Sequence, residues 1–335
     1  MNINFDLLRP KLEKLGKLQS SLDKPTESLE NWYDVELTHS SNAIEGNSLT
    51  RIETAEVMEK GLSAHISGKP LKDLLEARNL AEALKYIKRL ASNLKSHQFI
   101  TEKMILEIHR IILTGIDEMW AGKYRQSEIF VRGSNSNFPV PIVLPKLMNE
   151  LIKWIEIEQK ENPVKIAADF HYKFVSIHPF VDGNGRTARL LMNLVLAIHG
   201  YPMAVIRNEN RSEYLHALEV AQTKDEINGY YKIVFDAVDA SLDSYIKFYE
   251  DKSPLPENKS KKLMRIGELS KQTGETIHTL HFWIKEGLIK SKNKTMGGYQ
   301  LFDNETVSKI SKIRSLQKTQ RLSLTEIKSL TKDSI

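Results

Sequence analysis

A chain of 335 residues with 41% hydrophobic content can bury a large core, and its length predicts two or three domains. It contains no cysteine, which excludes a disulfide framework and a thiolate metal site, and it shows neither a basic, apolar leader nor a long apolar run, so we expect a cytoplasmic protein without a membrane span. The net charge of +5 is unevenly distributed, because acidic residues prevail before Lys259 and basic residues after it, which predicts a separate basic domain at the C-terminal end.

The first third of the chain is predicted to be helical. Residues 1–30 form an amphipathic helix and a turn, and a second helix over about 33–46 ends at a glycine, a common helix stop. Helices continue through residues 51–115, where Thr50 and Glu53 have the spacing of a capping box.

A change of pattern after these helices predicts a β-hairpin. Ile129, Phe130 and Val131 have high β-propensity, residues 133–137 have turn chemistry, and residues 138–143 form an extended arm with two prolines. Proline cannot donate to a strand ladder, so this arm is expected at an edge. An ordinary surface hairpin is the alternative to a functional one.

Residues 178–189 carry the densest chemistry in the chain. They lie between two apolar helical runs, residues 166–177 and 190–196, so we expect a loop between two buried helices. The loop combines an imidazole, a carboxylate, a Gly-Asn-Gly turn whose amides can face an anion, and two arginines on one helix face. These residues are His178, Asp182, Gly183, Asn184, Gly185, Arg186 and Arg189.

Each of these features alone has an ordinary explanation. A histidine can cap a helix, Gly-Asn-Gly can be only a turn, and arginines are usually solvated. Their combination within twelve residues favours a site for phosphate chemistry. An unperturbed imidazole is largely neutral at pH 7, so His178 can accept a proton.

The segments after this loop are predicted to be helical as well. A helix over residues 211–222 is followed by a last apolar helix over 233–246. His171 and His178 are two helical turns apart and could suggest a metal, but no third ligand is evident and we reject that interpretation.

The C-terminal part of the chain reads as a winged helix-turn-helix. A polar, proline-bearing linker precedes two short helices separated by a glycine turn, a wing and two further helices. These segments are residues 251–263, 266–274, 276–283, 298–302, 304–319 and 323–330.

The string at residues 178–189 resembles the signature of the Fic (filamentation-induced-by-cAMP) family, histidine-any-phenylalanine-any-acidic-Gly-Asn-Gly-Arg-any-any-Arg, at every fixed position. The resemblance implies a mainly α-helical Fic fold and transfer of AMP from ATP to a Ser, Thr or Tyr hydroxyl of a protein, with release of pyrophosphate. It implies that His178 is the general base and that Asp182 holds Mg²⁺.

The same resemblance implies that Gly183, Asn184 and Gly185 form an anion cradle, that Arg186 holds the β-phosphate and that Arg189 holds the γ-phosphate. The related Doc branch, which transfers phosphate, carries lysine in place of Gly185. Glycine at this position therefore favours nucleotidyl transfer.

Residues 41–46 resemble the Fic inhibitory motif, Ser/Thr-any-any-any-Glu-Gly/Asn, in which Ser41 and Glu45 are the fixed polar positions. The resemblance implies that Glu45 pairs with Arg189 and blocks the γ-phosphate pocket. Such a carboxylate satisfies the guanidinium and repels an incoming anion.

Two further roles follow from the family resemblance. The predicted hairpin around Ile129, Phe130 and Val131 would be a flap that aligns the target segment by β-augmentation. Tyr214 and Gln222 are candidates for shaping the nucleoside pocket, although a tyrosine at helical spacing is more often a core residue.

Residues 264–330 resemble the DNA-binding domain of the MerR family. MerR proteins usually carry arginine where His281 stands in the recognition helix and where Gln300 stands in the wing. Without these two guanidiniums, the domain could bind DNA, another protein or a second copy of itself.

We therefore expect a mainly α protein with four parts: an N-terminal helical region at 1–115, a Fic core at 116–250, a linker at 251–263 and a winged helix-turn-helix at 264–335. The expected activity is ATP- and Mg²⁺-dependent AMP transfer to a target protein or to the protein itself, inhibited by Glu45. Removal of AMP from a modified protein, and a DNA-binding regulator with a silenced Fic domain, are the alternatives; a homodimer is a further candidate assembly.

Overall fold

The computed structural model describes residues 3–21, 27–64, 66–129, 137–158, 160–250, 264–291, 293–294 and 300–319. The chain divides into two compact units, residues 1–253 and 254–335. Residues 1–115 and 116–250 thus belong to one unit, and the predicted linker at 251–263 lies outside the described residues.

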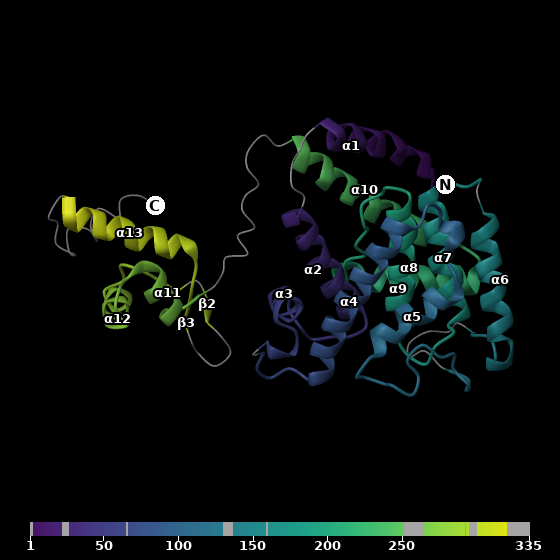
Figure 1. Cartoon of the computed structure of the whole chain (residues 1–335), viewed down its shortest axis with the longest axis horizontal. Coiled ribbons are helices and arrows are strands. Elements are labelled where there is room, and N and C mark those ends of the chain that lie inside the picture. Colours follow the sequence, from purple (N-terminus) through teal and green to yellow (C-terminus); the bar gives the residue numbers. More distant parts are fainter. Residues whose placement is uncertain are drawn as a thin grey trace. The chain divides into compact units, whose positions relative to one another are not determined.

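The first unit is built from helices (Figure 1). Its α-helices are α1 (Arg9–Ser21), α2 (Glu27–Ile44), α3 (Arg51–Lys60), α4 (Leu71–Asn93), α5 (Glu102–Leu113), α6 (Leu144–Ile157), α7 (Pro163–Ile177), α8 (Asn184–Ile198), α9 (Arg211–Lys224) and α10 (Asn228–Glu250). Short 3₁₀ helices are η1 (Phe5–Leu8), η2 (Gly61–Ser63), η3 (His97–Phe99), η4 (Pro141–Val143) and η5 (Asn208–Asn210). The mainly α fold is therefore confirmed.

Helices α7 and α8 form the centre of this unit. Each has an apolar face that is fully buried, as at Phe170 and Phe174 of α7 and Leu191 and Val195 of α8. Helices α4 and α5 pack against α8, whereas α6 and α10 pack against α7. The signature loop between α7 and α8 is therefore fixed at both ends by the best-packed helices of the unit.

The N-terminal helices pack around this centre. Helix α1 lies along α10 (Figure 1), where Lys11 Nζ pairs with Asp239 and Asp243 at 2.6 and 2.7 Å. Helix α2 contacts α3, α4 and α8. The predicted capping box is confirmed: the Thr50 side chain accepts a hydrogen bond from the Glu53 amide, and the Glu53 side chain accepts one from the Thr50 amide.

Helix α2 differs in its bounds from the helix predicted at about 33–46. It begins at Glu27 and ends at Ile44, so Glu45 is the first residue beyond it. Two carboxylates in the first turn, Glu27 and Glu30, favour the earlier start because they interact with the positive end of the helix dipole. Gly46, with φ 101°, provides the stop.

The predicted hairpin is only partly described. Ile129 lies in no regular element, and residues 130–136, which include Phe130 and Val131, are outside the described part of the chain. The prediction of an extended arm over residues 138–143 is wrong at its C-terminal end, because Pro141–Val143 forms the 3₁₀ helix η4. Proline fixes φ near the helical value and needs no donor in a first turn, so it starts this 3₁₀ helix.

The second unit contains a helix-turn-helix and a small sheet. Its elements are β1 (Met264–Arg265), α11 (Ile266–Thr273), α12 (Ile277–Lys285), β2 (Asn293–Lys294), β3 (Gln300–Phe302) and α13 (Asn304–Thr319). The antiparallel strands have the order β1-β3-β2, with Met264 opposite Phe302 and Asn293 opposite Leu301. The last predicted helix, over 323–330, lies outside the described residues.

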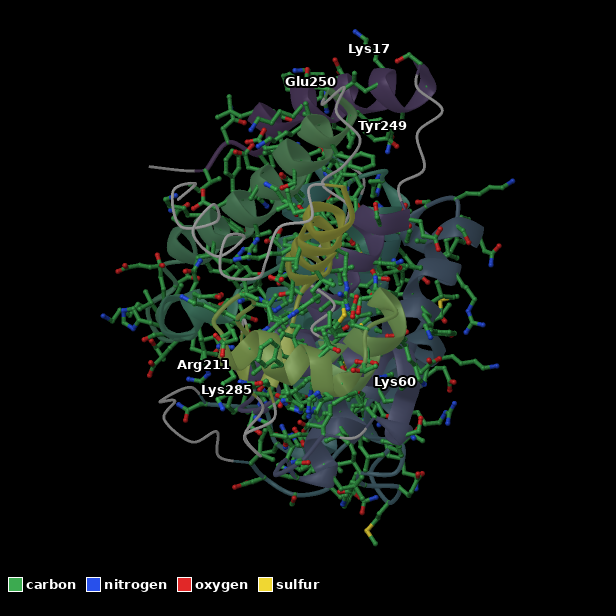
Figure 2. All side chains as sticks on the ribbon, turned by 90° about the vertical axis from the view of Figure 1, so that its left-hand side faces the viewer. Lys17, Lys60, Arg211, Tyr249, Glu250 and Lys285 are labelled. Carbon is green, nitrogen blue, oxygen red and sulfur yellow. The ribbon has the colours of Figure 1, made fainter. Side chains whose placement is uncertain are left out.

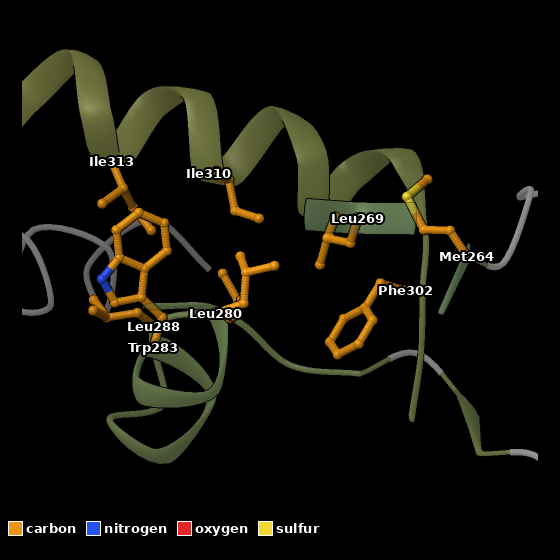
Figure 3. Close-up of a cluster of buried hydrophobic side chains, with 9 residues drawn as sticks. Met264, Leu269, Leu280, Trp283, Leu288, Phe302, Ile310 and Ile313 are labelled. Carbon is orange, nitrogen blue, oxygen red and sulfur yellow. The ribbon is translucent and has the colours of Figure 1, made fainter. Parts of the chain in front are cut away.

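A compact core holds this unit together. Leu269, Leu280, Trp283, Phe302 and Ile310 point toward one another between the helix pair, the sheet and α13 (Figure 3). All five side chains are buried. Burial of aromatic and aliphatic side chains at this density explains how so short a segment forms its own unit.

Over the part of the chain that the structure describes, no helix has both the length and the apolar character that crossing a membrane requires. The cytoplasmic location stays a prediction.

Candidate active site

His178 ends α7 in the left-handed conformation, with φ 51°. Its Nδ1 lies 3.3 Å from the Val175 carbonyl oxygen, which can only accept, so Nδ1 carries the hydrogen and Nε2 keeps its lone pair. Burial lowers the pKa of His178 to about 4. The imidazole is therefore neutral at pH 7 and has the free nitrogen that a base requires.

Arg125 holds the backbone on which His178 is placed. It is 2% exposed, and its Nε donates to the His178 carbonyl oxygen at 2.9 Å. Its amide donates to the Pro179 carbonyl at 3.0 Å, and its guanidinium also donates to Ser127 and Pro139 carbonyls. The strained left-handed residue is thus fixed by a buried arginine that the sequence did not single out.

His109 supports the other side of the loop. Its ring stacks on Phe180, with centroids 3.5 Å apart and planes 1° from parallel. The Gly122 amide donates to Nδ1 at 3.0 Å, so Nε2 carries the hydrogen and donates to the Asp182 carbonyl at 3.0 Å. Burial lowers the pKa of His109 to about 4, which keeps this arrangement intact at neutral pH.

The loop turns into α8 at Gly183, which has φ 78° and precedes the first helical residue. Asn184 fixes the turn, because its side chain accepts from the Phe180 amide at 2.9 Å and donates to the Phe180 carbonyl at 2.8 Å. The side chain of Asn184 is therefore occupied, and the helix N-terminus offers its backbone amides to an anion.

Asp182 lies at the mouth of the loop with about half of its side chain exposed. Its Oδ1 accepts from the Gly183 amide at 2.6 Å and pairs with Arg186 Nη2 at 3.1 Å. Burial alone would raise the pKa of Asp182, but the Arg186 charge and the Gly183 amide outweigh it and hold the pKa below its usual value. The carboxylate is therefore ionised at neutral pH.

Arg186 is 1% exposed and lies between two carboxylates. Its Nη1 is 3.0 Å from Glu76 Oε1, and its Nη2 is 3.1 Å from Asp182 Oδ1. Its Nε is buried and has no hydrogen-bond partner among the residues described. Asn47 Nδ2 donates to the second oxygen of Glu76 at 2.9 Å, so the turn after α2 is connected to Arg186.

Arg189, 4% exposed, is held by α2. Its Nε donates to Ser41 Oγ at 2.8 Å, and its Nη2 donates to the Ser41 carbonyl at 2.8 Å and to Glu45 Oε1 at 2.7 Å. The predicted Glu45–Arg189 pair is present. Burial would lower the pKa of Arg189, but the Glu45 carboxylate raises it, so this guanidinium stays charged and neutralised.

Gly185 explains how the Glu45 carboxylate fits. A Cβ built on Gly185 would lie 2.3 Å from Glu45 Oε1 and 3.0 Å from Arg189 Nη1. Only a residue without a side chain leaves this volume free. The carboxylate of Glu45 thus occupies the space directly above the second glycine of the loop.

Tyr214 is placed in the core. It is 1% exposed, and its hydroxyl lies 2.8 Å from His171 Nε2. His171 Nδ1 lies 2.9 Å from the Tyr230 hydroxyl, which donates to the Ala168 carbonyl at 3.0 Å. These hydrogen bonds join α9, α7 and α10 in the core of the unit.

Gln222, on α9, contacts the last turn of α7, two residues before His178. Its Nε2 donates to Ser176 Oγ at 3.2 Å and joins α9 to α7. Its proposed contact with a nucleoside stays a prediction.

In the second unit, α12 presents an exposed face made by His278, His281, Phe282 and Lys285. Gln300 lies on β3 and is partly exposed. The two positions that carry arginine in the MerR pattern are therefore both accessible to a partner.

These features define a Fic-type domain: a neutral histidine at the end of α7, a glycine loop that opens α8, and two buried arginines on that helix. The pattern of the Fic/DOC family matches residues 99–196, and the pattern of the MerR HTH family regulatory proteins matches residues 264–334. The chain belongs to the Fic/DOC family and carries a MerR-type helix-turn-helix at its C-terminal end.

Similar proteins agree with this assignment. A Fic domain-containing signaling protein from Bacteroides thetaiotaomicron is 31% identical, with a TM-score of 0.62 over 73% of this chain and 99% of that one. Fic-1 from C. elegans is 29% identical, with a TM-score of 0.62 over 74% of each chain. The protein adenylyltransferase Fic of Aedes aegypti is 39% identical over 208 residues, 62% of this chain and 40% of that protein. The chain thus spans less than half the length of this curated relative.

Proposed function

We propose that the first unit transfers AMP from ATP to a protein hydroxyl and that Glu45 inhibits this activity. The observation that carries the proposal is the neutral His178, with Nε2 free, at the edge of a loop whose next helix supplies Arg186 and Arg189. Relatives named protein adenylyltransferase support it. In the proposed reaction, His178 Nε2 takes the hydroxyl proton while the hydroxyl oxygen bonds to the α-phosphorus, and the bond to the leaving pyrophosphate breaks.

The chain's own residues position the nucleotide in this proposal. The amides at the start of α8 and the two guanidiniums would neutralise the phosphates, and the unpartnered Nε of Arg186 is available to one of them. Glu45 on Arg189 competes with the γ-phosphate for the same guanidinium. ATP bound beside this pair would have its α-phosphate displaced, and small displacements from the reactive geometry reduce rates strongly.

Mg²⁺ fits the site through Asp182. This carboxylate is ionised and half exposed, and its Oδ2 accepts no hydrogen bond from the described residues. Mg²⁺ is commonly bound by one or two carboxylates together with phosphate oxygens and water. The described residues contain no group of three or more acidic or histidine ligands, so the phosphates would have to complete the coordination. Bound there, the ion would neutralise charge on the phosphates.

Two variants and the wild type test the proposal in the presence of Mg²⁺ and ATP labelled at the α-phosphate. We expect strong self-labelling by Glu45→Gly, weak labelling by wild type and none by Glu45→Gly combined with His178→Ala. Because His178 acts only as the base, the last variant should still bind ATP. No label on any variant or on added cell proteins would contradict AMP transfer, and release of AMP from a modified protein would then be the next reaction to measure.

We also propose that the second unit binds DNA through α12 and the wing. The family match, the excess of basic residues after Lys259 and the exposed face of α12 support this. Another protein or a second copy of the chain would be the partner if duplex DNA does not bind.

A further inference from the structure

The position of the Glu45 carboxylate depends on how the end of α2 is held. Glu45 is the first residue after the helix, and the three amides that follow Ile44 donate to the carbonyls of Asn42 and Ala43. This turn leaves the Ile44 carbonyl without an intrahelical partner, as at any helix C-terminus. An outside group must satisfy it.

The C-terminal half of α2 is not anchored by apolar packing alone. Thr38 Oγ1, Ser40 Oγ and both polar atoms of the Asn42 side chain are buried and have no hydrogen-bond partner among the residues described. Burying an unpaired polar group costs free energy, so these four atoms oppose the docking of the helix. Other contacts must hold the helix against α8.

Arg211 provides one of these contacts. It is the first residue of α9, and its Nε donates to the Ile44 carbonyl at 2.6 Å, one residue before Glu45. Arg211 and Ile44 are 167 positions apart in the chain. Arg211 lies at the surface (Figure 2), so it can reach Ile44 without being part of the phosphate site.

Arg207, four residues earlier, provides the second contact. Its Nη1 lies 3.2 Å from Oε2 of Glu36, an α2 carboxylate that is 3% exposed, and its guanidinium lies 5.9 Å from the centre of the Trp32 ring. Arg51 Nε lies 2.7 Å from the other oxygen of Glu36. The segment 207–211 therefore contacts α2 near its middle and at its C-terminal end.

We propose that Arg207 and Arg211 form a clamp that positions α2 so that Glu45 meets Arg189. No hydrogen bond or ion pair joins the clamp residues to Arg189 or His178, so they act on the site only through α2. This inference rests on the proposed inhibition of AMP transfer by Glu45. It predicts that loss of the clamp weakens inhibition although Glu45 itself is unchanged.

The test is the double variant Arg207→Ala with Arg211→Ala, in which Glu36 keeps Arg51 as a partner. Loss of two polar contacts of ordinary strength should raise self-labelling about fivefold or more above wild type. In the Glu45→Gly background the same two changes should add nothing, because no inhibitory carboxylate is left to position. Arg110→Ala, which removes an exposed arginine paired with Glu107 on α5, is the matched control and should label as wild type does.

Hydrogen exchange of the amides at 40–46 gives a second measurement that needs no activity. The clamp variant should exchange faster there than wild type and the control, with α5 unchanged. If Glu45→Gly labels itself but the clamp variant stays at the wild-type level, the clamp is overturned and the proposed function stands. If Glu45→Gly does not label, the proposed function fails, and exchange alone decides: faster exchange at 40–46 supports the clamp and unchanged exchange overturns it.

Discussion

Glu45 and Arg189 are 144 positions apart in the chain, and their contact joins the end of α2 to the first turns of α8. The pair could be predicted because both residues belong to short patterns of fixed spacing. Arg125 and His109 could not, because they act through tertiary contacts with the backbone of His178 and Asp182 and have no local pattern of their own.

Gly185→Ala should displace the Glu45 carboxylate. The added Cβ would lie 2.3 Å from Glu45 Oε1, the mobile end of a side chain that can move away, whereas the helical backbone at Gly185 accepts alanine. We expect tighter binding of a non-hydrolysable ATP analogue than in wild type, measured by calorimetry.

The same substitution in the Glu45→Gly background is its control. There is no carboxylate to displace, so the Cβ can only narrow the anion cradle and affinity should stay equal or fall. Unchanged affinity of the single variant would show that Glu45 tolerates the Cβ.

The pH dependence of Glu45→Gly tests the base. Because the pKa of His178 is lowered to about 4, its neutral form prevails from pH 8 down to about pH 5, and kcat/KM should show no loss near pH 6.5 that is due to this residue. An inflection near 6.5, the ordinary value for histidine, would contradict a buried and neutral base. The rate of label incorporation at constant ionic strength measures this.

At the scale of elements, helical periodicity was sufficient to predict the helices around the signature loop. It failed where local chemistry changes within a few residues: Pro141 starts a 3₁₀ helix in a segment predicted to be extended, and α2 begins six residues before the predicted start. Which polar face of α2 is buried depends on α4 and α8, so the sequence alone could not show its unpaired groups.

The proposed DNA binding by the helix-turn-helix predicts how the affinity for DNA depends on salt concentration. His281→Arg combined with Gln300→Arg should restore two phosphate contacts, so the slope of log affinity for a mixed-sequence duplex against log salt should become steeper by about 1–2. Ser20→Arg, at an exposed position of α1, adds one guanidinium to the first unit and is the control. A slope that does not change in the double variant would favour a protein partner.

At the scale of the whole molecule, the length and the charge asymmetry predicted more than one part, and two compact units are found. The sequence placed a boundary at residue 115 that is not a boundary between compact units. The reason is that α4 and α5, on the N-terminal side of that position, pack directly against α8 on the other side. Helices on the two sides of residue 115 therefore share one core.

The first unit should lose stability as the pH falls below about 6.5. His109, His171 and His178 have pKa values lowered to about 4, 3 and 4 by burial, whereas an unfolded histidine titrates near ~6.5. Between these values the unfolded chain binds more protons, so stability is full above pH 6.5 and declines toward pH 4, by ~1.4 kcal/mol per pH unit for each histidine. Urea unfolding of the full chain at pH 7, 6 and 5 should show this decline. His109→Gln should reduce the slope of the free energy of unfolding against pH by the contribution of about one proton. His281→Gln, on the exposed face of α12, should leave this slope unchanged. A free energy of unfolding that is constant over this range would contradict three buried neutral imidazoles.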